Sequence, residues 1–188
     1  VILATGSQEE IAAEENSPFS HPRVLSTWAF ERMLNPDGPT GGELRLPDGS
    51  VPASIALVHC GDSTGHAPGT RCSATCCMAM AKYVEQIAHS NPDVRVYEFA
   101  WDRSLGGPAY TNVDPSERPR EYAEVRFGMS DSVTVTVDAP RDRVRIDYAR
   151  GDVRKALPVD LAVVATPMEG ARDVRELAGL LGVALDTN

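Results

Sequence analysis

The sequence contains little cysteine, and what it has is confined to one stretch. Its 188 residues include four cysteines, Cys60, Cys72, Cys76 and Cys77, and none elsewhere. No apolar run approaches the roughly 20 residues of a membrane span, and no secretory signal stands at the start. A disulfide framework is therefore a poor explanation of the thiols, and we expect a cytoplasmic protein without a membrane span.

Basic residues are also scarce. Lys and Arg number 18 against 27 Asp and Glu, which gives a net charge of −9 and a pI of about 4.9. Nucleic acids and anionic membranes are bound through clustered Lys and Arg, so neither is expected as a partner. The 42% hydrophobic and 24% charged residues are ordinary globular values. No internal repeat or low-complexity tract is visible.

Strand and helix patterns alternate along the chain. The run SIALVH before the first cysteine predicts a buried parallel strand, and CCMAMAKYVEQIAHS after it predicts a helix, because apolar residues recur every three or four positions. Strands are expected at Val1–Ala4, Ser54–His59, Val94–Trp101, Glu124–Phe127, Ser132–Val137, Arg143–Tyr148 and Asp160–Ala165, and helices at Ser26–Leu34, Cys76–Ser90 and Ala171–Leu181. This order predicts an α/β fold, a Rossmann-like module with an antiparallel hairpin excursion.

The turn after Ser54–His59 lacks the G-x-G-x-x-G that holds a dinucleotide pyrophosphate in such folds. The cysteines occupy that place with the spacing C-x11-C-x3-C-C, and no nicotinamide site is expected. Four thiolates are the ligand count of one [4Fe-4S] cluster or one zinc ion. Structural zinc usually shows paired C-x2-4-C knuckles, which are missing, and the start of a helix favours an anionic cluster. The spacing favours iron–sulfur and leaves zinc open.

At these residues the chain resembles the A subunit of heterodisulfide reductases. That family has a cysteine after a strand, then C-S-x-x-C-C at the start of a helix and a basic residue shortly after. Here the corresponding segments are HCGDS, RCSATCC and AMAK, with Lys82 in the basic position. The resemblance extends to VILATGS with HPRVLSTWAFERML, to NPDVRVYEFAWDRSLGGPAY and to DLAVVAT.

The resemblance implies a thioredoxin-reductase-like flavoprotein. It assigns one [4Fe-4S] cluster to Cys60, Cys72, Cys76 and Cys77, close to an FAD held mainly by chain outside this sequence. The turn Ala4, Thr5 and Gly6 is expected to line that flavin. The implied activity is that of an oxidoreductase subunit that relays electrons between FAD and the clusters of other redox subunits.

The start at VILATGS without an initiator Met and the end at LLGVALDTN suggest an interior segment of a longer polypeptide. On this interpretation residues 1–50 are the tail of a flavin-binding domain with a linker, and residues 51–188 are a Rossmann-like iron–sulfur domain. The segment alone is not expected to be active.

The same residues allow other interpretations. A zinc-stabilised scaffold that docks redox partners without electron transfer of its own is the alternative function. His59 and His66 flank the cysteines, and a histidine in that place can hydrogen-bond to a cluster or ligate it. Asp62, Ser63 and His66 contain the residue types of a catalytic triad, but triad partners normally meet through the fold rather than within one loop.

Overall fold

A five-stranded parallel sheet forms the centre of the molecule. The computed structural model describes residues 2–9, 11, 17–59, 75–100, 119–127, 131–166 and 168–185. The strands, in sheet order, are β2 (Val24–Ser26), β9 (Leu161–Val164), β3 (Ser54–Val58), β4 (Arg95–Ala100) and β5 (Tyr122–Arg126). Every residue of β3 and β9 is buried, as expected for parallel strands covered on both faces.

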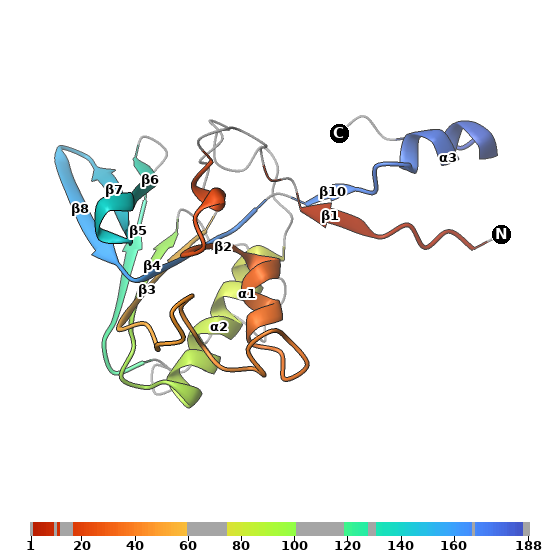
Figure 1. The fold of residues 1–188 in the computed structure, drawn as a ribbon. Helices are drawn as coiled ribbons and strands as arrows, with labels where there is room; N and C mark the ends of the chain where they lie inside the picture. The colour runs from red at the N-terminus through yellow and green to blue at the C-terminus, as the bar shows by residue number, and fades with distance from the viewer. Residues whose placement is uncertain are drawn as a thin grey trace.

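Two helices cover one face of this sheet (Figure 1). They are α1 (Thr27–Met33) and α2 (Cys76–Ser90), and the sequence predicted both. Ser26 caps α1 through a hydrogen bond that its hydroxyl accepts from the Ala29 amide, as its residue type suggested. Phe30 of α1 and Met80, Val84 and Ile87 of α2 pack against the apolar side chains of β3, β4 and β9. Trp28 of α1 does not share this core and is 46% exposed.

An antiparallel sheet of three strands covers the opposite face. It consists of β6 (Ser132–Asp138), β7 (Arg143–Arg150) and β8 (Val153–Val159), with a short 3-10 helix, η4 (Ala139–Arg141), between the first two. The hairpin of β6 and β7 was predicted, whereas β8 was hidden in a charge-rich run. Only the last residue of β8 is fully buried, so its pattern is too polar to reveal a strand.

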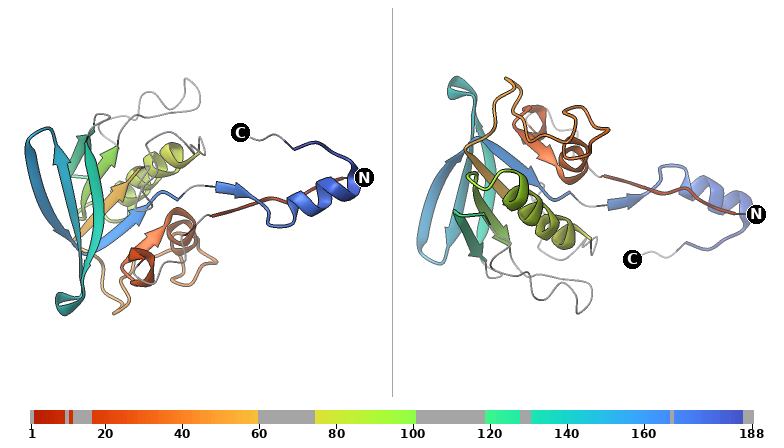
Figure 2. Two further views of the ribbon diagram at one scale, coloured as in Figure 1. Left: turned by 90° about the horizontal axis from the view of Figure 1, so that it is seen from above. Right: turned by 90° about the horizontal axis from the view of Figure 1, so that it is seen from below.

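A two-stranded ribbon extends away from this body (Figure 2). It pairs β1 (Ser7–Glu9) with β10 (Met168–Gly170), and α3 (Val174–Leu181) follows β10 at its outer end; a 3-10 helix, η1 (Pro18–Ser20), lies between β1 and β2. The apolar strand predicted at Val1–Ala4 is not found: residues 2–6 form no strand, and Ile2 is 94% exposed. Apolar character alone does not order a strand where no described element covers it.

The predicted fold class is confirmed. The parallel sheet with helices and the separate antiparallel sheet match the Rossmann-like module with its hairpin excursion. The domain boundary at residue 50 stays a prediction, and β2 and α1, which precede it, share the sheet and core of the following residues. No helix among the described residues is long and apolar enough to cross a membrane.

Candidate metal centre

Two of the four cysteines begin helix α2. Cys76 and Cys77 are 9% and 2% exposed, and both pack in the apolar core beneath α2 with Met80 and Tyr83. Cys60 and Cys72 fall in residues 60–74, outside the described residues, so their place in the site stays a prediction. Within the described ranges no group of three or more His, Cys, Asp or Glu residues could hold a metal ion.

The start of α2 suits an anionic group. The first turn of a helix presents amides without intrahelical acceptors and a partial positive charge. The first turn of α2 contains no acidic residue that would compete for this charge. Thiolates are the form of cysteine that binds metal, and a metal centre held by thiolates is an anionic group of the kind that a helix N-terminus favours.

A buried polar network lies at the end of β3, next to the cysteine segment. His59 follows β3 directly and is 0% exposed, and its Nε2 lies 2.6 Å from Oε1 of Glu98 in β4. The Tyr122 hydroxyl in β5 donates to the other oxygen of Glu98. The His59 amide donates a 2.8 Å bond to the Phe99 carbonyl, which continues the β3–β4 ladder up to the residue before Cys60.

The described residues fit a metal group at this position. His59 Nδ1 is buried and has no hydrogen-bond partner in the part of the chain that the structure describes. Imidazole nitrogen and thiolate sulfur are both ligand types for iron and zinc, so these residue types are compatible with a metal group whose remaining donors would be Cys60 and Cys72. The sequence drew attention to His59 because it directly precedes Cys60, whereas its partners Glu98 and Tyr122 were missed. The signal for Glu98 was a carboxylate within the apolar strand pattern VYEFA.

The basic residue of the cysteine motif has a structural partner. Lys82 Nζ donates a 2.6 Å hydrogen bond to Glu31 of α1, and both side chains are about half exposed. Partial burial alone would raise the pKa of Glu31, but hydrogen bonding to Lys82 and Tyr83 lowers it. The Tyr83 hydroxyl donates a 3.0 Å bond to the Thr27 carbonyl, and burial raises the tyrosine's pKa. These contacts fix the cysteine helix against α1.

The predicted flavin-lining residues lie just before the ribbon in the sequence. Ala4, Thr5 and Gly6 are exposed and directly precede β1, and Gly6 has a positive φ of 68°. A left-handed backbone at this position is accessible to glycine without strain. No described contact links these three residues to the buried thiols, so their role stays a prediction.

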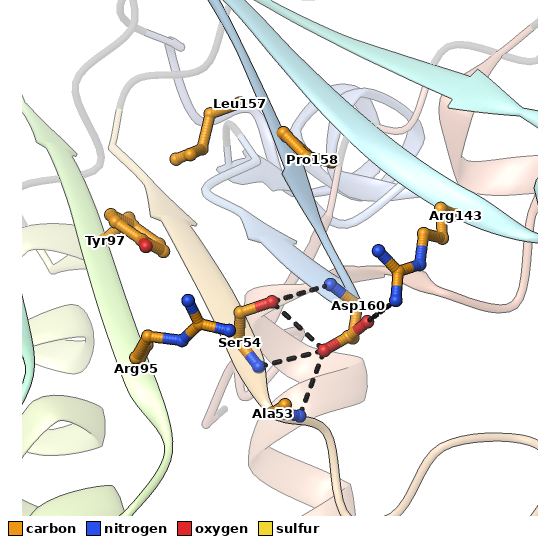
Figure 3. Close-up of a pocket in the computed structure, with 8 residues that line it drawn as sticks. All are labelled: Ala53, Ser54, Arg95, Tyr97, Arg143, Leu157, Pro158 and Asp160. Atoms are coloured by element: carbon orange, nitrogen blue, oxygen red, sulfur yellow. Dashed lines mark hydrogen bonds and ion pairs between the residues drawn. The ribbon is translucent and has the colours of Figure 1, made fainter.

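A small cavity lies at the amino-terminal ends of β3 and β4 (Figure 3). It has a volume of about 230 Å³, and Arg95, Tyr97, Arg143 and Asp160 contribute to its lining. The Asp160 carboxylate accepts hydrogen bonds of 3.0 Å from the amides of Ala53 and Ser54 and from the Ser54 hydroxyl. Asp160 thereby fixes the amino-terminal end of β3.

Comparison with known proteins identifies relatives along nearly the whole chain. No family model matches it. The chain is 30% identical over 97% of its length to the A subunit of the H(2)/formate:CoB-CoM heterodisulfide,ferredoxin reductase of Methanococcus maripaludis. It is also 30% identical over 97% of its length to an iron-sulfur A subunit of the CoB–CoM heterodisulfide reductase of Methanopyrus kandleri. The chain spans 28% and 29% of the length of these two relatives.

A solved structure supports the fold. The L-lysine 6-monooxygenase from Pseudomonas syringae superposes with a TM-score of 0.55 at 14% identity, over 98% of this chain and 49% of that one. Such a likeness concerns the architecture alone. The sequence relationship agrees with the cysteine motif: over 97% of its length the chain is similar to part of the A subunits of heterodisulfide reductases.

Proposed function

We propose that Cys60, Cys72, Cys76 and Cys77 hold one [4Fe-4S] cluster in an electron-transfer subunit of an oxidoreductase. The observation that carries this proposal is the buried pair Cys76 and Cys77 on the first turn of α2. The name of the Methanopyrus kandleri relative, an iron-sulfur subunit, supports the same metal. A cluster would accept and release single electrons at this place.

The surrounding residues would tune and shield such a site. First-turn amides of α2 would donate to the sulfur atoms, which stabilises negative charge. Met80 and Tyr83, both almost fully buried, exclude water from the inner side of the helix. Exclusion of water and hydrogen bonds to sulfur are two of the means by which proteins set cluster potentials.

The flavin belongs to the same proposal. Ala4, Thr5 and Gly6 would line an FAD whose other contacts come from chain outside this sequence, and electrons would pass between that FAD, the cluster and partner subunits. The relatives' names describe subunits of heterodisulfide reductases, one of them a heterodisulfide,ferredoxin reductase. Other redox subunits in the cytoplasm are therefore the proposed partners.

The cysteines can be tested by spectroscopy on anaerobically purified protein. We expect a broad absorbance in the visible range that dithionite bleaches, and its loss in Cys76→Ser. His89→Gln, at the exposed far end of the same helix, is the matched control and should retain the absorbance. A Cys76→Ser protein with unchanged absorbance and bleaching would overturn the assignment. A colourless wild type that contains one zinc ion would favour the scaffold function instead.

A further inference from the structure

A carboxylate is buried inside the central sheet. Glu98 is 1% exposed and stands between Tyr97 and Phe99 in β4. Burying a carboxylate is costly unless it is paired and hydrogen-bonded. Glu98 meets this requirement with both oxygens, one against His59 Nε2 at 2.6 Å and the other against the Tyr122 hydroxyl. Three adjacent strands are thus joined by one polar group.

This network lies on the same face of the sheet as the thiol pair. Residues alternate between the two faces of a strand. Val96 in β4 and Leu57 in β3 pack under the helices with Cys76 and Cys77, so Glu98 and His59, two positions further along, face the same side. The strands β3 and β4 are parallel, so the chain must start α2 near the edge where β3 ends.

The two ring nitrogens of His59 differ in their hydrogen bonding. Its Nε2 is engaged by Glu98, whereas Nδ1 is buried and finds no hydrogen-bond partner within the described ranges. Buried polar atoms are nearly always satisfied, so such an exception calls for a ligand or a group from outside the described residues. A carboxylate that orients one imidazole nitrogen while the other addresses a metal is a common arrangement around metal sites.

We propose that His59 is a positioning residue of the metal centre, with Nδ1 in contact with the iron–sulfur cluster and Glu98 and Tyr122 holding its ring. This inference rests on the proposed function, because it requires a cluster on the cysteines. Four thiolates and one supporting imidazole would then define the site. The strand end before Cys60 would be fixed in orientation before the metal binds.

The contact can be tested in the wild type by pulsed electron paramagnetic resonance. Protein labelled with 15N-histidine and reduced with dithionite should show a 15N hyperfine coupling to the cluster. The coupling should vanish in His59→Gln and persist in His66→Gln. A cluster signal without 15N coupling would overturn the inference, as would a coupling that only His66→Gln removes.

The roles of Glu98 and Tyr122 in holding the His59 ring can be tested with two variants and a carboxylate control. Glu98→Gln and Tyr122→Phe should keep the iron content and shift the midpoint potential of the cluster. Asp160→Asn, which alters a carboxylate at the opposite edge of the same sheet, should leave the potential unchanged. If the cluster of Glu98→Gln has the same midpoint potential as that of wild type, the inference about His59 is overturned, although the proposed cluster is not. A wild type that never binds iron would instead overturn the proposed function.

Discussion

Glu9 and Thr166 are hydrogen-bonded to each other where the two strands of the ribbon meet the body of the molecule. The Thr166 hydroxyl, just after β9, donates a 2.7 Å hydrogen bond to the Glu9 carboxylate at the end of β1, although 157 positions separate them. The same carboxylate accepts from the Ser26 hydroxyl at 2.6 Å and from the Trp28 amide at 3.0 Å. The Glu9 side chain therefore connects both strands of the ribbon to the start of α1.

Loss of this carboxylate should loosen the ribbon. In Glu9→Ala we expect a destabilisation of about 1–3 kcal/mol, because hydroxyl and amide donors lose their acceptor. Amide hydrogen exchange should accelerate in β1 and β10 more than in β3. Glu43→Ala, which removes an exposed carboxylate paired with Arg45, is the control and should change neither quantity. Unchanged exchange in the ribbon of Glu9→Ala would show that the junction is held by other contacts.

The packing of helix α2 against α1 should depend on the hydroxyl of Tyr83. Tyr83→Phe leaves the Thr27 carbonyl without its 3.0 Å donor in a buried place, which costs about 1–3 kcal/mol. The ring and its edge-to-face contact with Phe30, at 4.9 Å between centroids, remain. Urea unfolding monitored by circular dichroism measures the difference. Equal midpoints for Tyr83→Phe and wild type would contradict the role given to this hydrogen bond.

The ion pair between Arg23 and Asp142 should make the stability of the protein depend on pH in the acidic range. Arg23 is 7% exposed and donates a 2.6 Å bond to Asp142, and this bond lowers the carboxyl's pKa. A carboxyl with a depressed folded pKa contributes stability above its unfolded pKa, about 3.9, and loses it as the pH falls through the folded value. We therefore expect thermal stability to fall progressively below about pH 4.

Asp142→Asn tests this assignment. Asn tolerates the left-handed backbone of this residue, where φ is 47°, so the turn should survive. The variant should be less stable at neutral pH and lose less stability on acidification. Asp37→Asn, in an exposed turn, is the control and should follow the wild-type profile. An Asp142→Asn profile parallel to that of wild type would assign the acid sensitivity to other carboxyls.

The sequence predicted those elements whose patterns reflect burial. β3 and α2 were recognised because uniform burial produces the run SIALVH, and one buried helix face produces apolar residues at every third or fourth position. β8 escaped because most of its residues are exposed, although it pairs with the neighbouring β7. The ribbon escaped because its strands are three residues long and pair across the chain, with Gly170 opposite Ser7.

The candidate site was predictable only in part. Its four cysteines lie in one stretch of the sequence, residues 60–77, so their spacing alone suggested a common site. The support around His59 comes from three strands, and no local pattern connects Glu98 to Tyr122. Such contacts are set by strand order, which places β5 beside β4. A single sequence contains the residue types but not this order.

The central claim is most directly tested by counting metal and sulfide in anaerobically purified protein. The four cysteines should yield about four iron atoms and four acid-labile sulfides per chain with no stoichiometric zinc. One zinc ion per chain without labile sulfide would contradict the iron–sulfur assignment and identify a structural zinc site instead.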